Sequence, residues 1–405
     1  MTSKISKTIP ARHRFLLGSV FMGHLANDWV AGTIWIIAPA IATSLGLGPT
    51  EVGLILAING VGAGLCYIPA GMIADRSKRP GLLMLMTFWW VAIGYFLATL
   101  VPGFWPITLL LALGVMGDAF WHPVATGVLV KEMPERRAQA LGIHAVGGSI
   151  GAEVLGPLSA GFLLGFFDWQ TTMQILIIPA LVMGVFFIPM SLRISRESTT
   201  VVQTINFKVL INHWAQKTGL GLMLVLIFYN MTLMAILSMM PLFLQIDHGL
   251  TAFHSGLIFA GFLVIGSFLQ PGLGRYTDTR GRRQVVLLFL FLAATFALFA
   301  GLSQGLYWAL LGLFPALVML TAIRPVLLAI AVEYSSQSAS TTLGIVFTVL
   351  DGVGMVGALF AGLIGEINLA YAFMMAAVFA TLAGLIFLQL PDTKSVSEAV
   401  SSGAI

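Results

Sequence analysis

Charged side chains are scarce in this chain of 405 residues. Lysine, arginine, aspartate and glutamate together make up only 9% of it, whereas 58% of the residues are hydrophobic. A soluble domain carries about 25% charged residues. The polar residues are therefore too few to cover a water-soluble globule, and the composition points to a protein embedded in a lipid bilayer.

Cysteine is almost absent as well, because Cys66 is the only one. A single thiol excludes an internal disulfide and argues against a cysteine-based metal site. The sequence also lacks a glycine-rich phosphate-binding loop ending in Lys and Ser or Thr, which argues against ATP as the energy source. Glycine is abundant, with 44 residues, and small residues let membrane helices approach one another closely.

Long apolar stretches occupy most of the chain behind a polar arm at residues 1–14. We expect this arm to be retained rather than cleaved as a signal peptide, because the apolar run behind it is too long and contains His, Asn and Asp. A helix needs about 20 apolar residues to cross a bilayer. Twelve spans are expected, at 15–43, 51–73, 81–101, 106–130, 139–165, 169–191, 218–244, 252–273, 284–303, 306–331, 341–364 and 368–390.

The basic residues lie on one side of this predicted topology. Of the 20 Lys and Arg residues, all but Arg324 fall in the N-terminal arm, in the loops after even-numbered spans, or in the tail 391–405. Because Lys and Arg favour the cytoplasmic side, we expect both termini in the cytoplasm. The net charge of +4 is then explained by topology, and we expect no nucleic-acid partner.

A short motif occurs twice, half a chain apart. Gly71-Met-Ile-Ala-Asp75-Arg76-Ser-Lys-Arg79 follows the second span, and Gly274-Arg-Tyr-Thr-Asp278-Thr-Arg-Gly-Arg282-Arg283 follows the eighth, at an offset of 203 residues. The repeat predicts two homologous six-helix halves, 15–192 and 218–390, joined by a cytoplasmic linker at 193–217. Duplicated transporters of this kind place the substrate site between the halves, near the bilayer midplane.

With twelve spans and this repeated loop, the chain resembles the major facilitator superfamily. The resemblance implies an all-α membrane protein of two pseudo-symmetric six-helix bundles. It also implies that the loops gate the conformational cycle. The first loop departs from the family pattern at Lys78 and Pro80, and the second at Thr279. The gating residues implied are Gly71, Asp75, Arg76, Arg79, Gly274, Asp278, Arg282 and Arg283. The alternative is a basic loop that only enforces topology.

Ionisable side chains within the first span are the first functional candidates. His24, Asn27 and Asp28 lie at i, i+3 and i+4 and so share one helical face. Such groups cost about 2.5–3.5 kcal/mol each to insert into a membrane. Asp28 falls near the midplane, where a carboxyl group could take up and release a coupling proton. The alternative is a structural hydrogen bond between helices.

The fourth and fifth spans carry three further candidates for proton coupling. Asp118 and His122 lie one turn apart, and Glu153 lies near mid-membrane. The alternative for the first two is a structural His–Asp pair. A metal site would need a third ligand, which the sequence does not specify, so we expect neither a metal nor a cofactor.

Gly156 and Pro157 resemble the helix 5 signature of drug/proton antiporters within the superfamily, which implies a gating role. The alternative is a glycine-softened packing seam.

Arg324, in the tenth span, is the one basic residue at membrane depth. A guanidinium stays charged at any relevant pH, so it needs a buried acid or an anionic substrate. Asp351 in the eleventh span is the candidate acid, and a permanent bridge between the two is the structural alternative. The residues expected to line the substrate site are Asn27, Trp121, Tyr229, Asn230, Arg324 and Asp351.

The motifs His-x-x-Asn-Asp in the first span and Phe-Trp-His-Pro in the fourth resemble the fosmidomycin-resistance branch of the superfamily. This implies a monomeric bacterial inner-membrane exporter, with lipid around it, that expels a small and possibly anionic compound against entering protons. A proton symporter importing an organic anion, metabolite or siderophore is the alternative, and a non-transporting receptor is a more distant one. No reactive constellation predicts an enzyme.

Overall fold

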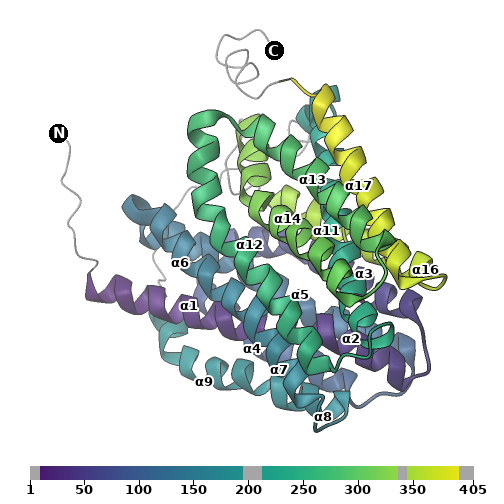
Figure 1. Ribbon diagram of the computed structural model, residues 1–405. Helices are drawn as coiled ribbons and strands as arrows, with labels where there is room; N and C mark the ends of the chain where they lie inside the picture. The colour runs from purple at the N-terminus through teal and green to yellow at the C-terminus, as the bar shows by residue number, and fades with distance from the viewer. Residues whose placement is uncertain (1–9, 195–211, 336–343, 392–405) are drawn as a thin grey trace.

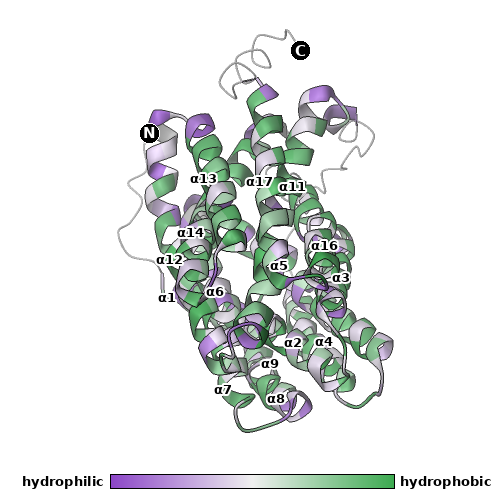
Figure 2. Cartoon of the chain, turned by 45° about the vertical axis from the view of Figure 1, so that its right-hand side comes forward, coloured by the Kyte–Doolittle hydropathy of each residue, from purple (hydrophilic) through white to green (hydrophobic). Residues whose placement is uncertain are grey.

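The computed structural model describes residues 10–194, 212–335 and 344–391. Within these ranges, twelve helical spans are long and apolar enough to cross a membrane. They form two six-helix bundles (Figure 1), which confirms the predicted fold class. Hydrophobic residues dominate the helices along their length, and hydrophilic residues gather toward their ends (Figure 2). The predicted boundaries of arm, halves, linker and tail stay predictions, because residues 1–9, 195–211 and 392–405 lie outside the described ranges.

Spans 1 to 6 make up the N-terminal half. Their elements are α1 (Ala11–Gly32), α2 (Ile34–Ser44), α3 (Pro49–Arg76), α4 (Pro80–Ala98), α5 (Phe104–Glu132), η1 (Pro134–Arg136), α6 (Arg137–Ser149), η2 (Ile150–Leu155), α7 (Gly156–Leu163), α8 (Trp169–Leu176) and α9 (Ile178–Arg193). Spans 7 to 12 make up the C-terminal half. Their elements are α11 (Lys217–Ile246), α12 (Ala252–Arg280), α13 (Arg282–Leu302), α14 (Leu306–Ser335), η3 (Thr348–Val353), α16 (Val356–Gly365) and α17 (Leu369–Gln389).

Local sequence explains many of the helix starts. Prolines occupy the first turn of α3 and α4, where a missing backbone N–H costs nothing. Asp168 caps α8 by accepting a hydrogen bond from the Thr171 backbone N–H at 2.7 Å, and this contact lowers the pKa of the exposed Asp168 carboxyl group. Gly281 separates α12 from α13 with a φ of 97°, which favours glycine.

Four spans of the described chain are interrupted, and in span 6 the break lies at Ile177, between α8 and α9. Span 1 breaks between α1 and α2 at Thr33, beside Gly32, where a Cβ would lie 2.3 Å from the carbonyl oxygen of Ala152. Span 5 runs through α6, η2 and α7, and span 11 contains η3 and α16. Both η2 and η3 are π-helical turns, which often occur at functional sites. The sequence did not predict either of them.

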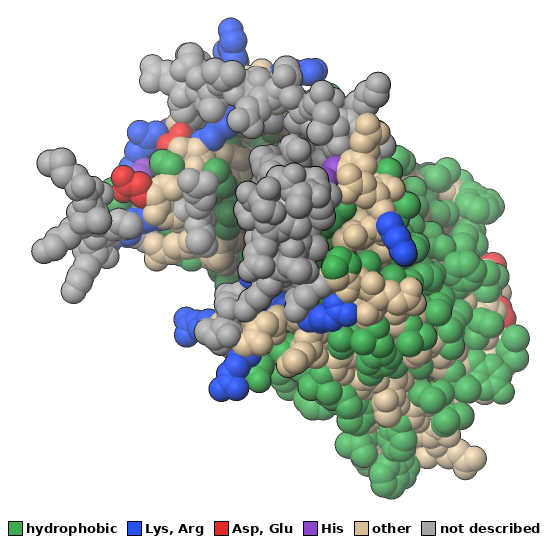
Figure 3. Space-filling view, turned by 90° about the horizontal axis from the view of Figure 1, so that it is seen from above, with side chains coloured by type: hydrophobic (Ala, Val, Ile, Leu, Met, Phe, Trp, Pro, Cys, Tyr) green, Lys and Arg blue, Asp and Glu red, His purple; other side chains and the backbone are tan. Residues whose placement is uncertain are grey.

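The two ends of the molecule differ in charge. We call the end that holds the start of α1 and the ends of α3, α5, α9, α12 and α17 the basic end, because Arg76, Lys131, Arg193 and Arg280 lie at these helix termini. Figure 3 views the molecule from above Figure 1: Lys and Arg side chains lie on this face, and hydrophobic side chains cover the flank. At the opposite end, Glu51 lies in the first turn of α3, and Asp168, Asp247 and Glu366 lie next to helix ends.

The two halves touch directly at this opposite end, which we call the closed end. A Cβ built on Gly53 of α3 would lie 2.4 Å from the carbonyl oxygen of Ala358, and one on Gly161 of α7 would lie 2.5 Å from that of Ala252. Each pair joins the N-terminal half to the C-terminal half. The backbones therefore meet without space for a side chain.

Nearer the basic end, the same helices lose this contact. A Cβ built on Gly71 of α3 would have one described atom within 4 Å, the Cβ of Pro123 at 3.9 Å. Pro123 belongs to the same half as Gly71. A Cβ on Gly274 of α12 or on Gly142 of α6 would meet no described atom within 4 Å. The structure is thus sealed at the closed end and spread apart toward the basic end.

Candidate functional site

Five ionisable side chains from three helices of the N-terminal half form one group, in which all but His122 are buried. They are His24 and Asp28 of α1, Asp118 and His122 of α5, and His144 of α6, and we call them the histidine cluster. His24 Nε2 lies 3.3 Å from Asp28 Oδ2, and His122 Nε2 lies 3.7 Å from Asp118 Oδ2. The predicted sharing of a face by each pair is confirmed by these distances.

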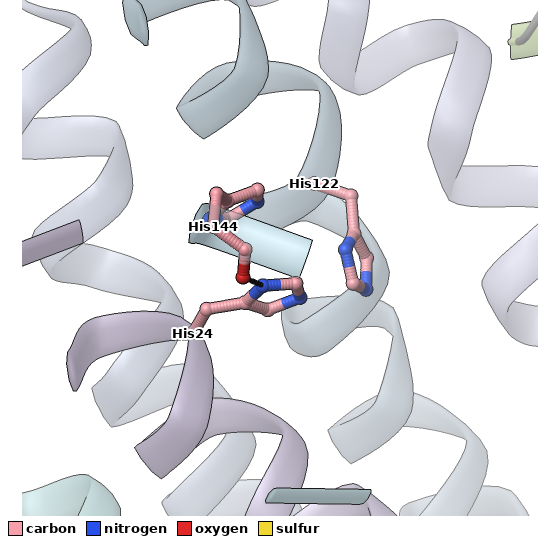
Figure 4. Close-up of side chains that lie close together, drawn as sticks. All are labelled: His24, His122 and His144. Atoms are coloured by element: carbon pink, nitrogen blue, oxygen red, sulfur yellow. Dashed lines mark hydrogen bonds between the residues drawn. The ribbon is translucent and has the colours of Figure 1, made fainter. Parts of the chain in front are cut away.

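His144 is the member that sequence reasoning did not assign to the site. Its ring stacks on that of His24 with centroids 3.9 Å apart, and the ring of His122 meets His24 edge-on at 4.9 Å (Figure 4). His24 Nδ1 lies 2.7 Å from the backbone carbonyl oxygen of His144. A carbonyl oxygen only accepts, so His24 Nδ1 carries the hydrogen and donates it. This orients His24 Nε2 toward Asp28.

Glycines on α6 and η2 bring span 5 into contact with α1. A Cβ on Gly147 would lie 2.5 Å from the carbonyl oxygen of Phe21, and one on Gly151 would lie 2.4 Å from that of Leu25. A Cβ on Gly148 would lie 2.6 Å from His24 Nε2. The close approach permitted by these glycines explains why His144 reaches a residue 120 positions earlier in the chain.

The second site lies where η2 faces the C-terminal half. Glu153, the fourth residue of η2, accepts a hydrogen bond from the hydroxyl of Ser267 on α12 at 2.6 Å. The predicted carboxyl group thus sits at the contact between the halves, and Ser267 is a partner that sequence reasoning missed. No pattern in the sequence indicates this hydroxyl.

Asp351 occupies the corresponding place on η3. It is also the fourth residue of its π-helical turn, and it accepts a hydrogen bond from the hydroxyl of Tyr67 on α3 at 2.9 Å. Arg324 Nη2 of α14 lies 3.3 Å from the other oxygen of the same carboxylate. The predicted pairing of Arg324 with Asp351 is therefore present, while Tyr67 was not expected.

The two π-helical turns thus make equivalent contacts between the halves. Each presents one acid to a hydroxyl of the other half, Glu153 to Ser267 and Asp351 to Tyr67, and we call these the seam pairs. The side chains of Arg324 and Asp351 are 33% and 24% exposed although they lie within their spans. Open space therefore adjoins the second pair, inside the molecule and between the halves.

Four residues that we expected to line the substrate site are not exposed to any open space. Asn27, Trp121, Tyr229 and Asn230 are each fully buried. Tyr229 donates to the carbonyl oxygen of Leu320, and Asn230 donates to that of Leu350. In this conformation all four pack helices together, and their assignment to substrate binding stays a prediction that this structure does not support.

The predicted gating residues fall into two sets. Gly156 and Pro157 lie on the sealed side: a Cβ on Gly156 would lie 2.7 Å from the carbonyl carbon of Gly32, and one on Gly256 of α12 would lie 2.5 Å from the Pro157 carbonyl oxygen. Pro157 thus contacts the opposite half, whereas Gly156 packs within its own half. Their role in gating stays a prediction.

The repeated loops lie at the basic end. Arg76 and Arg79 are exposed there. Arg282 pairs with Glu333, and Arg283 donates to the carbonyl oxygens of Leu388 and Leu390, so these contacts join helices of one half. The environments of Gly71 and Gly274 are open, as described above. The side chains of Asp75 and Asp278 lie outside the described part of the chain, and gating by this loop pair stays a prediction.

Comparison with known sequences identifies the family. The profile of the Major Facilitator Superfamily matches residues 20–319 and 222–403. The chain is 24% identical over 400 residues to the fosmidomycin resistance protein of Escherichia coli K12, which covers 96% of each chain. It is 32% identical over 167 residues to the enterobactin exporter EntS of Citrobacter koseri, covering 38% of this chain and 39% of that one.

Comparison with solved structures gives the same fold. A bacterial homologue of the human lysosomal transporter Spinster, in an inward-facing and occupied conformation, superposes with a TM-score of 0.75 at 17% identity. The match covers 94% of this chain and 97% of that one. The relatives are transporters, in agreement with the prediction that the chain is not an enzyme. Family profile, relatives and fold together show that the chain belongs to the major facilitator superfamily and is a multi-pass membrane transporter.

Proposed function

We propose that this transporter is a proton-driven exporter of a small organic compound in the bacterial inner membrane, with its basic end in the cytoplasm. The observation that carries the proposal is the pair of acids on η2 and η3, each bonded to a hydroxyl of the opposite half. The full-length similarity to a fosmidomycin resistance protein supports export as the direction.

Alternating access follows from the contrast between the two ends. The halves pack backbone to backbone at the closed end and diverge toward the basic end. In the proposed cycle the halves rock about the site between them, so that the closed end opens while the basic end seals. The seam pairs lie across the surfaces that must separate, so they break and form during this motion.

We assign proton coupling to Glu153, because the protonation state of its carboxyl group affects the hydrogen bond with Ser267 that joins the two halves. When Glu153 is a carboxylate, it accepts a charge-assisted hydrogen bond from the hydroxyl of Ser267. Protonation removes the charge and weakens that bond, which favours separation of α12 from η2. An entering proton would therefore drive one direction of the rocking motion.

Arg324 is proposed to hold an anionic group of the compound. One edge of the guanidinium faces Asp351, and a third of the side chain is exposed. A carboxylate or phosphonate could bond the remaining N–H groups in the planar, bidentate geometry that arginine favours. The bound anion would then share the guanidinium with Asp351, the acid of the second seam pair, so that substrate binding and the contact between the halves are coupled through Arg324.

Reconstituted vesicles test the proposal, with fosmidomycin, a phosphonate, as the probe. We expect Glu153→Gln to retain fosmidomycin binding but to lose at least tenfold of the transport rate driven by a proton gradient. Asp168→Asn is the matched control, since Asn can still cap α8 and the residue is exposed outside the spans. Full gradient-driven transport by Glu153→Gln would remove Glu153 from coupling.

The direction is tested in the same vesicles by reversing the gradient. An exporter moves the compound opposite to the protons, whereas an uptake symporter accumulates it only together with them. Accumulation with symported protons would overturn export in favour of uptake, and binding without any flux would favour a receptor.

A further inference from the structure

The histidine cluster contains more ligand-type atoms than a proton site requires. One nitrogen from each of His24, His122 and His144 lies within 4.8 Å of the other two, and the same is true of ligand atoms from Asp28, Asp118 and His122. His122 belongs to both sets, so a group of three imidazoles adjoins a group of two carboxylates. The sequence predicted no metal because no third ligand was evident; the tertiary structure supplies His144.

Several of these atoms have no partner although they are buried. The ring of His144 faces the backbone of Val20, and its other nitrogen lacks a hydrogen-bond partner among the described residues; the exposed fraction of the residue is 4%. His24 Nε2, Asp28 Oδ1 and Asp118 Oδ1 are unpartnered as well. Each unsatisfied buried polar group costs about 1–3 kcal/mol. A single cation that accepts one lone pair from each of these side chains would remove several such costs at once.

The shape of the site limits the size of that occupant. A Cβ on Gly148 would lie 2.4 Å from His24 Cε1 and 2.8 Å from Asp28 Oδ2. The α6 backbone is thus pressed against the His24–Asp28 pair, and not even a methyl group fits between them. An organic ligand therefore has no space between Gly148 and this pair.

The orientation of His24 is that of a metal ligand. Its Nδ1–H donates to the His144 carbonyl oxygen, which leaves Nε2 as the nitrogen with the lone pair, on the side of the ring that faces Asp28. Histidines that bind metals almost always donate their other ring N–H to a carbonyl or carboxylate, which sets the tautomer. His144 therefore has two roles. Its backbone carbonyl oxygen sets the tautomer of His24, and its ring is a member of the histidine cluster.

We propose that the histidine cluster binds one divalent transition cation of the Zn²⁺ class, through His24, His122 and His144 with carboxylate oxygen from the aspartates. Nitrogen and oxygen donors in this ratio suit Zn²⁺ or Co²⁺, whereas Mg²⁺ and Ca²⁺ take oxygen ligands. Bonds of about 2.0–2.1 Å place tetrahedral ligands roughly 3.3 Å apart. On binding, the donors therefore close by at most about 1.5 Å, and the stacked rings of His24 and His144 turn so that one nitrogen of each faces the ion. Two ionised aspartates balance the double positive charge inside the membrane.

This site is separate from the one that carries the proposed function. It lies within the N-terminal half, on α1, α5 and α6, whereas the seam pairs join the two halves. The side chain of His122 is 27% exposed, so the cation has a route to the cluster from the open space between the halves.

The test uses the purified full chain, freed of any affinity tag and stripped with a chelator. Titration with Co²⁺ alone should show one visible-absorbing ion per chain, which Zn²⁺ displaces. His144→Gln should weaken Co²⁺ binding at least tenfold, while His254→Gln, an exposed histidine at the start of α12, should bind as the parent does. Equal affinity in His144→Gln and the parent, or no stoichiometric binding, would overturn the proposal in favour of a cluster that exchanges only protons.

A second measurement on the parent protein covers the possibility that His144→Gln fails to fold. X-ray absorption of the Zn²⁺-loaded chain should report three imidazole ligands and at least one oxygen. A zinc ion surrounded by fewer than two imidazoles would place it outside the cluster and refute the site. Loss of gradient-driven transport in Glu153→Gln has no bearing on this result, so the two proposals fail independently.

Discussion

At the scale of single residues, Arg324 is the residue that we propose selects the kind of compound that the site accepts. Its guanidinium faces an acid at 3.3 Å, yet a third of the side chain remains exposed. An exposed pair in water is worth about 0–1 kcal/mol, but this one lies between helices where competing water is limited. A permanent structural bridge and a substrate anchor therefore predict different responses to mutation.

Replacement of Arg324 by Gln separates these two roles. We expect binding of an anionic probe such as fosmidomycin to weaken about tenfold or more, since hydrogen bonds to charged groups contribute about 1.5–3 kcal/mol. Binding of a neutral probe should change little. The measurement is a thermal-shift titration with both compounds, and Arg12→Gln, whose side chain is 73% exposed beside Glu132, is the control. Equal loss for both probes would mean that Arg324 only holds Asp351.

At the scale of elements, the N-terminus of α3 is completed by the other half. Glu366, between α16 and α17, accepts a hydrogen bond from the backbone N–H of Thr50 at 3.0 Å. The first N–H groups of a helix have no partner within it, and a negative charge near them is favourable. Glu51 of α3 accepts from the Gly48 N–H, and Glu366 adds a second capping contact from across the closed end, which opening of that end must break.

Removal of this cap should favour the opposite conformation. A lost cap costs about 1 kcal/mol, so Glu366→Ala should raise the open fraction of the closed end roughly fivefold. The reporter is a cysteine at Ala358, which is fully buried there, in a background with Cys66→Ser. Its labelling rate should rise in Glu366→Ala and remain unchanged in Glu132→Ala, an acid at the basic end. Unchanged labelling in both variants would show that the contact does not hold the end closed.

At the scale of the whole molecule, contact between backbones seals one end. A Cβ built on Gly53 would lie 2.4 Å from a carbonyl oxygen of the opposite half, and one built on Gly161 would lie 2.5 Å from another. Comparable glycines nearer the basic end meet no such obstacle. The balance between the two conformations thus depends on small residues at the closed end, which can be tested without touching any charged group.

A larger residue at Gly53 should force the closed end apart. Overpacking typically costs about 1–3 kcal/mol, so Gly53→Val should shift the equilibrium between conformations by roughly fivefold to a hundredfold. A cysteine at Ser255, which is fully buried at the start of α12, reports the change through faster labelling. Gly127→Val is the control, because a Cβ there meets no described atom within 4 Å. If Gly53→Val folds and its labelling stays slow, the sealed end does not depend on this contact.

Much of this architecture could be predicted from the order of the residues alone. The twelve spans, the repeated loop and the pairs His24–Asp28 and Asp118–His122 depend on helix length and on i,i+4 spacing, which are local properties. Bilayer thickness sets the length of a span whatever its neighbours are. For the same reason, the predicted ends of the spans differ from the observed helix ends by only a few residues in most cases.

The contacts between residues far apart in the sequence were decided only by the packing of the helices. His144 joins His24 across 120 residues, Ser267 joins Glu153 across 114, and Tyr67 joins Asp351 across 284. No local period encodes such meetings, because they depend on which glycines let two backbones approach and on where a π-helical turn rotates a side chain. The same dependence put Asn27, Trp121, Tyr229 and Asn230 into helix contacts, since position along a helix predicts depth in the membrane but not which neighbour covers the side chain.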